Sequence, residues 1–192
     1  MLLAPHIAEH RDQYVAFFRQ VLALNWQAGA SLTPELLVVH GDADPPFNSG
    51  RIDVALTAPP DDRVTFQAVD LERCWNPPRG LTQHTSGVTL QLAPFQWSRC
   101  QFHFSADPAR THLEVSRWAT SRIDLDDRAP PDSDGIQGVV HYVHLHAEGA
   151  AHTLAVDFGT APAEALDELL SVLASAEVRA VRISEGLDET PR

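Results

Sequence analysis

The stretch TLAVDFGTAPAEALDELLSVLASAEVRAVRIS (Thr153–Ser184) decides the fold class. Its apolar pattern predicts a strand over Thr153–Phe158, a helix over Ala163–Ser175 with leucines on one face, and a strand over Val178–Ser184. Pro162 suits the start of that helix, because the first helical turn does not need its missing N–H. The end of the chain is therefore expected to form a β-α-β unit.

Two other segments show helical signals. Apolar residues at helical spacing predict an amphipathic helix over Ile7–Trp26, with Gly29 at its C-terminal end. Ser31 and Pro34 resemble a hydroxyl cap and an early helical proline, so a helix start is expected there. Leu36–His40 is expected to form a short helical turn or a strand.

The middle of the chain has a different pattern. From residue 51 to residue 146, short apolar runs alternate with proline and glycine breaks, which favours strands joined by turns. The predicted strands are Arg51–Thr57, Val64–Val69, Gly87–Leu92, Gln96–Ser105, His112–Ser121 and Gly138–His146. Because the connections are short, antiparallel pairing is expected.

Together these segments predict a single α+β domain over residues 1–192. Its sheet is mainly antiparallel, with an N-terminal helix and a C-terminal β-α-β unit. Residues 1–6 and 186–192 are expected to be frayed. The acidic, proline-rich segment Asp124–Gly135 is expected to be a mobile surface loop.

Composition narrows the possible functions. Hydrophobic residues make up 44% of the chain and charged residues 21%, as in ordinary globular domains. The net charge of −12 disfavours nucleic acid and anionic membranes as partners. The chain contains no lysine, which excludes Schiff-base chemistry and a lysine-dependent phosphate-binding loop.

Cysteine usage and the N-terminus bear on the compartment. Cys74 and Cys100 form no CxxC motif, and the first residues lack the basic flank and apolar run of a signal peptide. We therefore expect a cytoplasmic protein with both thiols reduced.

Two motifs near residue 40 suggest chemistry but lack necessary partners. LVVHGDADP (Leu37–Pro45) resembles the acid-bearing strand and loop of α/β-hydrolases, yet the chain has no Gly-x-Ser-x-Gly elbow. Asp42, Asp44, Asn48 and Gly50 are typical calcium-loop residues, but their spacing differs from that of a calcium loop. A solvated turn is the favoured interpretation.

A histidine-rich strand offers an alternative function. Strand alternation places His144 and His146 on one face with Tyr142, and His141 on the other face with Val143. A His-x-His pair can present two imidazoles to a divalent metal such as zinc. Candidate third ligands are His103, His112, Glu114 and His84. The pair therefore indicates either a metal-dependent enzyme or metal-binding β-domain, or a polar exposed sheet face.

Aspartates gather in two segments that the proline and glycine pattern places at the surface. These residues are Asp42, Asp44, Asp124, Asp126, Asp127, Asp132 and Asp134. Surface carboxylates of this kind attract basic proteins over long range. We predict that these residues contribute to binding a basic protein partner.

The segment VDFGTAP (Val156–Pro162), followed by the leucine-rich helix and the last strand, resembles the closing block of small bacterial immunity proteins. Proteins of that class are cytoplasmic inhibitors that neutralise a cognate secreted toxin. The resemblance implies a non-catalytic binding domain without a cofactor, whose partner is a basic toxin.

Overall fold

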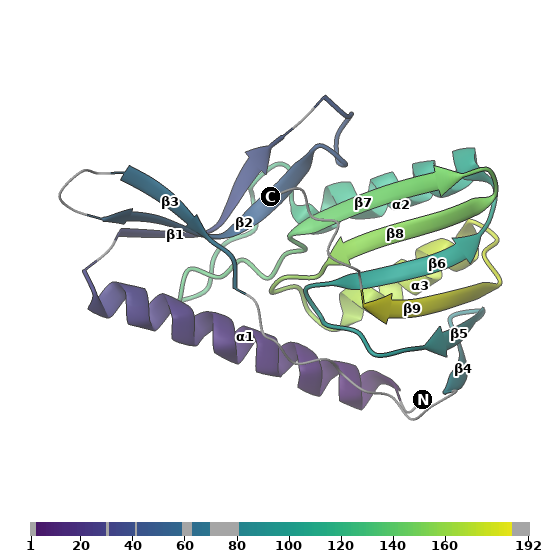
Figure 1. The fold of residues 1–192 in the computed structure, drawn as a ribbon, viewed down its shortest axis with the longest axis horizontal. Helices are drawn as coiled ribbons and strands as arrows, with labels where there is room; N and C mark the ends of the chain where they lie inside the picture. The colour runs from purple at the N-terminus through teal and green to yellow at the C-terminus, as the bar shows by residue number, and fades with distance from the viewer. Residues whose placement is uncertain (1–2, 30, 41, 59–62, 70–80, 186–192) are drawn as a thin grey trace.

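The computed structural model describes residues 3–29, 31–40, 42–58, 63–69 and 81–185. In this part of the chain, three helices and nine strands form an α+β fold with a mostly antiparallel sheet, as the sequence predicts (Figure 1). Helix α1 (Leu3–Gln27) opens the chain and includes residues 3–6, which were expected to be frayed. Residues 186–192 lie outside the described residues.

Nine strands build the sheet. Their bounds are β1 (Ser31–Val39), β2 (Ser49–Ala58), β3 (Arg63–Gln67), β4 (Thr82–Thr85), β5 (Val88–Leu92), β6 (Cys100–Ser105), β7 (Tyr142–Glu148), β8 (Ala151–Asp157) and β9 (Ala180–Glu185). The order is β1-β2-β7-β8-β6-β9-β5-β4, and β3 pairs with β2. Among the hydrogen-bonded strand pairs of the described residues, only β5 and β9 are parallel.

The sheet has two parts joined by a narrow connection. Strands β1, β2 and β3 form one part, and the other six strands form the second (Figure 1). The ladder between them pairs only Gly50 in β2 with Tyr142 in β7. Side-chain contacts must therefore supply much of what holds the two parts together.

The C-terminal unit has the predicted order of strand, helix and strand. Helix α3 (Glu164–Ser175) follows β8 and leads to β9. Strand β6 lies between β8 and β9 and is antiparallel to both, so β8 and β9 are parallel to each other but are not neighbours. The unit is thus a β-α-β crossover with one strand inserted.

Helix α2 (Pro108–Ile123) replaces the strand predicted over His112–Ser121, so that prediction was wrong. The Asp107 side chain accepts a hydrogen bond from the Arg110 N–H at 2.8 Å, and Pro108 occupies the first turn. Both features are standard helix-start signals. The buried residues of α2 recur at helical spacing: Thr111, Val115, Trp118, Ala119 and Ile123.

The helix start expected at Ser31 was also wrong. Residues 31–39 form β1, which pairs antiparallel with β2 over most of its length. At the start of β1, exposed and partly buried side chains alternate. This alternation is the pattern of a strand that buries one of its faces. Tertiary pairing here outweighs the local capping pattern.

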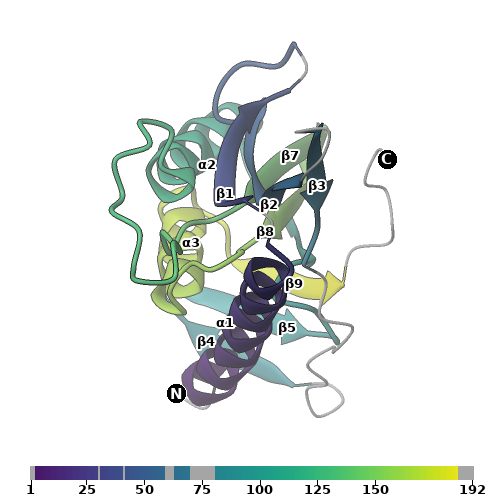
Figure 2. The same cartoon turned by 90° about the vertical axis from the view of Figure 1, so that its left-hand side faces the viewer.

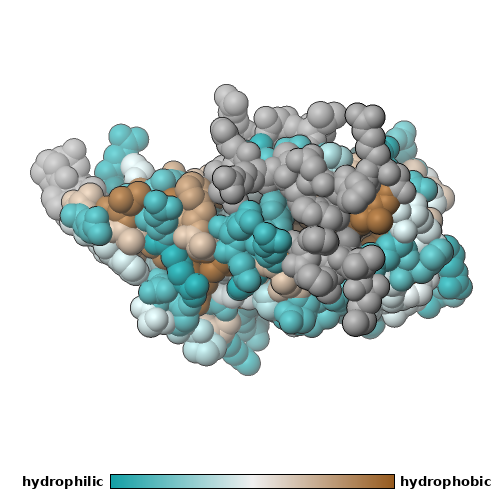
Figure 3. All heavy atoms as spheres, turned by 90° about the horizontal axis from the view of Figure 1, so that it is seen from below, coloured by the Kyte–Doolittle hydropathy of each residue, from teal (hydrophilic) through white to brown (hydrophobic). Residues whose placement is uncertain are grey.

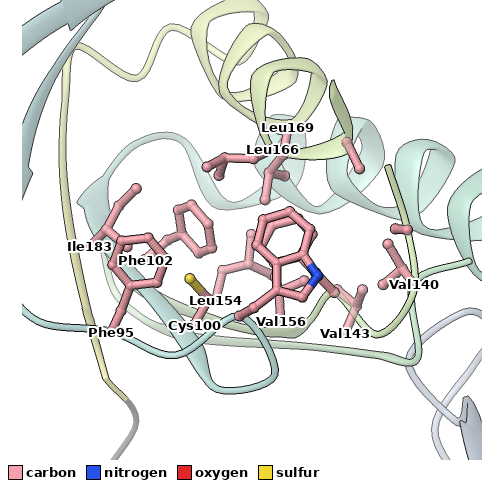
Figure 4. Close-up of a cluster of buried hydrophobic side chains, with 14 of the residues drawn as sticks. Phe95, Cys100, Phe102, Val140, Val143, Leu154, Val156, Leu166, Leu169 and Ile183 are labelled. Atoms are coloured by element: carbon pink, nitrogen blue, oxygen red, sulfur yellow. The ribbon is translucent and has the colours of Figure 1, made fainter. Parts of the chain in front are cut away.

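Two helices cover one face of the larger part of the sheet. Figures 1 and 2 place α2 and α3 side by side on that face. The core lies between these helices and the sheet, and Figure 4 shows side chains from the strands and from α3 pointing toward one another. Cys100 is buried there, and burial raises the pKa of its thiol well above the usual range. Cys74 lies outside the described residues.

Helix α1 spans both parts of the sheet (Figure 1). Near its start, the His10 ring contacts Phe95 edge-on at a centroid distance of 6.1 Å. Near its end, Asn25 Nδ2 donates to Gln67 Oε1 at 3.1 Å. None of the helices in the described ranges has the length and apolar character needed to cross a membrane.

Some apolar side chains stay exposed near the C-terminal end of α1. Leu24 is 58% exposed, and Val64 and Phe66 of β3 are 50% and 60% exposed. Figure 3 shows hydrophobic surface among hydrophilic side chains at this end of the molecule. The larger part of the sheet, by contrast, packs its apolar face against α2 and α3.

Candidate binding groove

A buried polar junction links the two parts of the sheet. His141, just before β7, lies between two carboxylates: Nδ1 is 2.6 Å from Asp53 Oδ1, and Nε2 is 2.8 Å from Glu35 Oε1. The Thr160 hydroxyl also donates to Glu35 Oε1. All four residues are buried. We call Glu35, Asp53, His141 and Thr160 the polar junction.

Opposite charges stabilise one another in the polar junction. Burial alone would lower the pKa of His141, but its hydrogen bonds to Asp53 and Glu35 outweigh burial and raise that pKa well above the usual value. Burial alone would raise the pKa of Glu35, but the His141 contact, the Thr160 hydroxyl and the Gln137 amide lower it overall. The junction therefore holds an imidazolium between carboxylates.

The backbone around His141 leaves no room for larger residues. Gly159, in the turn after β8, has a φ of +49°, and a Cβ there would lie 2.1 Å from His141 Cδ2. Glu35 itself has a φ of 52°, a backbone angle that residues other than glycine seldom adopt. The close approach of the His141 ring therefore requires a glycine at position 159.

The polar junction is saturated with hydrogen bonds. Both ring nitrogens of His141 hold carboxylates, and the Gln137 and Val69 amides donate to Glu35 and Asp53. A general base needs a free ring nitrogen, and so does a metal ligand. The geometry therefore gives His141 a structural role.

Arg51 extends this network to the end of α2. Its side chain is 1% exposed and donates to the backbone carbonyls of Glu35, Ile123 and Asp124 at 2.7 to 2.9 Å. It also donates to Asp127 Oδ1 at 2.9 Å. Strand β2 therefore holds the loop that follows α2.

A groove of about 570 Å³ lies on the outer side of α2 and α3. We call it the α2–α3 groove. Its lining residues are Glu114, Arg117, Trp118, Ser121 and Arg122 from α2, and Glu164, Asp167, Glu168, Ser171 and Val172 from α3. Four carboxylates and two guanidinium groups line it, so its charge is negative.

Arginines engage only part of that negative charge. Arg122 donates to Glu168 across the groove, and Arg117 lies 3.3 Å from Glu114 on the same helix. Glu164 and Asp167 have no cationic partner among the residues that the structure describes. Two carboxylates of the groove remain available to a cation.

Asp167 shows the effect of this arrangement. Its partial burial raises its pKa, and the neighbouring Glu164 charge raises it further. The positive end of a helix dipole favours carboxylates in the first turn, which acts in the opposite direction. Repulsion between the two carboxylates therefore remains, and a bound cation would relieve it.

The structure places the predicted acidic residues in two different environments. Asp42 and Asp44 lie exposed in the turn between β1 and β2. In the segment after α2, Arg19 of α1 lies 2.9 Å from both Asp132 and Asp134. Figure 2 shows this segment on the same side of the molecule as α2 and α3.

The remaining aspartates of this segment also have arginine neighbours. Asp127 bonds to Arg51, and that hydrogen bond lowers its pKa. Asp124 ends α2, lies 3.5 Å from Arg51 and accepts from the Ala129 N–H. Asp126 lies 3.5 Å from Arg128, and both are exposed. Hydrogen bonds and ion pairs thus connect this segment to α1 and β2, and its mobility stays a prediction.

The predicted histidine pair lies on the sheet face opposite α2 and α3. His144 and His146 are exposed, and His144 stacks on Tyr142 at a centroid distance of 6.3 Å. Strand register puts His146, Thr153 and His103 in one row, so His103 is the candidate third ligand on the same face. However, His103 uses its nitrogens to contact Thr153 and Ser184.

The other candidate third ligands lie elsewhere. His84 bonds to Thr89, His112 packs against Phe47, and Glu114 lines the α2–α3 groove. In the described residues, the group with metal-ligand spacing is Asp53, His141 and Asp157, whose ligand atoms lie within 4.8 Å of one another. It does not include His144 or His146.

Sequence reasoning missed the groove because it missed α2. The leucine face of α3 was predicted, but Glu164 and Asp167 gain a facing surface only when α2 packs beside α3. The signal was present in the Asp107-Pro108 cap and in the helical spacing from Thr111 to Ile123.

Comparison with protein-family models, curated proteins and solved structures finds no match to this chain.

Proposed function

We propose that this protein is a non-catalytic binding domain that recognises a basic protein partner, in the manner of a bacterial immunity protein. The resemblance of Val156–Pro162 to such proteins and the net charge of −12 support this class of function. An inhibitor of this kind would act in the cytoplasm of the cell that makes the toxin. Its partner would be the toxin itself.

The observation that carries the proposal is that Glu164 and Asp167 have no cationic partner within the part of the chain that the structure describes. Both side chains are exposed and belong to the α2–α3 groove. Elsewhere in the described chain, the clustered aspartates after α2 have arginine neighbours. A basic partner would supply the cation that the described residues do not supply, and would relieve the repulsion between Asp167 and Glu164.

The predicted aspartates keep a supporting role in this proposal. Asp42, Asp44 and Asp126 are exposed and add to the attractive field around the molecule. Asp124, Asp127, Asp132 and Asp134 are partly neutralised by arginines, so we expect them to affect folding as well as binding. Direct contact with the partner is assigned to the groove.

The proposal is tested with the genes next to this one, because immunity genes lie beside their toxin genes. A basic protein encoded there should be toxic when made alone and harmless when made together with this protein. The two purified proteins should form a stable complex. If no neighbouring product is toxic, or if the toxic product is neither bound nor neutralised, the proposed function is wrong.

A further inference from the structure

We infer that the α2–α3 groove is the docking site for one amphipathic helix of the partner that carries lysine or arginine along its flanks. This inference rests on the proposed function, because it specifies the form in which the partner presents its positive charge. It starts from the spacing of the lining residues. On both helices these residues fall at positions i, i+3, i+4, i+7 and i+8, starting from Glu114 and Glu164.

That spacing means that each helix turns one continuous face into the groove. The two helices are antiparallel: Arg110 at the start of α2 donates to Glu177 just after the end of α3, whereas Arg122 near the end of α2 bonds to Glu168. Two adjacent antiparallel helices leave a furrow between their ridges, into which a third helix can pack. The shape therefore suits a helix.

The length of the groove sets the length of the helix. Each lining face covers nine residues, which at about 1.5 Å per residue spans roughly 12 Å. An occupant of about two and a half turns or more would contact the whole groove. Helix-in-groove recognition works at this scale, with anchors spaced one turn apart.

The chemistry of the groove specifies the two sides of the occupant. Half-buried Val172 and the edge of Trp118 that remains exposed form the apolar part of the lining, and carboxylates line both helices. An amphipathic helix would set its apolar ridge against Trp118 and direct its basic side chains to Glu164 and Asp167. Rim charges of this kind guide orientation and accelerate association.

Trp118 provides a spectroscopic reporter in the wall of the groove. Trp118 is 6% exposed and lines the groove, yet its Nε1–H has no hydrogen-bond acceptor among the described residues. A buried indole N–H normally finds an acceptor. Its proton signal is expected to shift when a docked helix packs against the exposed edge of the Trp118 ring.

A second copy of this chain is a poor occupant. Each copy carries a net charge of −12, so two copies repel one another at long range. The groove adds negative charge at the point of contact. A helix of opposite charge, from another protein, is the occupant that the electrostatics favour.

The probe is a 14-residue peptide of leucine and lysine whose sequence forms an amphipathic helix. A scrambled peptide of the same composition, without helical periodicity, is the control. The helical peptide should bind, shift the Trp118 indole N–H signal in NMR spectra and bind at least about fivefold more tightly than the scrambled peptide. The signal is assigned by its loss in Trp118→Phe.

Charge is tested with matched variants. Glu164→Gln with Asp167→Asn should weaken binding of the helical peptide at least about fivefold, because both rim carboxylates are lost. Glu148→Gln removes an exposed carboxylate at the β7–β8 turn and should leave binding unchanged. Circular dichroism verifies that every variant is folded.

Three results would overturn the inference: no binding, equal binding of the scrambled peptide, or binding that leaves the Trp118 signal and the Glu164/Asp167 dependence untouched. These outcomes differ from failure of the proposed function. If a neighbouring toxin is neutralised but does not shift the Trp118 signal, the function stands and the groove assignment is wrong. If the helical peptide binds the groove but no toxin exists, the groove stands and the proposed function is wrong.

Discussion

Three separate chain segments meet at His141. Its ring nitrogens reach Glu35 of β1 and Asp53 of β2, and Gly159 of the β8–α3 turn lies against the ring. A buried ion pair of this kind adds little net stability, but removing one partner strongly destabilises the fold because the other charge stays buried. Substitutions here should therefore act mainly on folding.

Gly159→Ala tests the steric part of this arrangement. The new Cβ would lie 2.1 Å from His141 Cδ2, so the free energy of unfolding should fall by about 2 kcal/mol or more. Gly149→Ala is the matched control, since Gly149 also has a positive φ, +61°, but nothing within 4 Å of its Cβ position. Equal losses in urea denaturation would mean that backbone strain alone, without the His141 contact, explains the effect.

The raised pKa of His141 predicts how stability depends on pH. The folded protein holds a proton on His141 that the unfolded chain releases above about pH 6.5, so folding takes up a proton. This contribution is complete below about pH 6.5 and is lost as pH rises through the raised pKa, by up to about 1.4 kcal/mol per unit. His141→Gln should lack this slope.

Urea denaturation of both proteins from pH 6 to pH 9 measures the difference. We expect the stability gap between wild type and His141→Gln to be largest near pH 6 and to narrow as pH rises. Glu35, whose pKa is lowered, acts in the opposite direction and loses its contribution only in acid. Parallel pH profiles in this range would contradict an imidazolium at position 141.

Among the secondary-structure elements, α2 connects the fold to the proposed function. It covers the sheet, carries Trp118 and forms one wall of the groove. Its N-terminus depends on Asp107, whose side chain accepts from the Arg110 N–H. Loss of the helix would remove the groove together with part of the core.

Asp107→Ala should therefore lower the free energy of unfolding by about 1 kcal/mol, the usual cost of losing an N-terminal cap. Asp126→Ala serves as the comparison, because Asp126 is exposed and has only a 3.5 Å contact with exposed Arg128. Thermal unfolding of the two variants provides the measurement. A loss in Asp126→Ala as large as that in Asp107→Ala would contradict the capping role.

The sequence predicted the two helices with strong leucine or apolar periodicity and missed α2. The leucine period of α3 and the apolar spacing of α1 identified both helices. Alternation also placed His141 on the same side as buried Val143. In the region of α2, the proline and glycine breaks on either side were interpreted as marking a strand, although Asp107-Pro108 is a helix-start signal.

The polar junction could not be predicted from local pattern. Glu35 and His141 are 106 residues apart, and Asp53 and His141 are 88 residues apart. Only the pairing of β1 with β2 and the placement of the β8–α3 turn bring them together. The same reason applies to Arg51, which bonds to a loop more than 70 residues later.

At the scale of the whole molecule, charge is unevenly compensated. Arginines of α1 and β2 neutralise part of the acidic segment after α2, whereas two carboxylates of the groove have no cationic partner among the described residues. The long-range field of a −12 protein attracts a basic partner, and the groove gives that attraction a specific end point. The central claim is that this groove receives the partner's positive charge.

The most direct measurement is the association rate constant of the neighbouring basic toxin, from low to physiological salt. For the wild type we predict a steep fall, by about tenfold or more, as salt screens the attraction. Glu164→Gln with Asp167→Asn should associate more slowly at low salt and depend less on salt, whereas Glu148→Gln should behave like the wild type. Equal rates and equal salt slopes for the groove variant and the wild type would contradict the account.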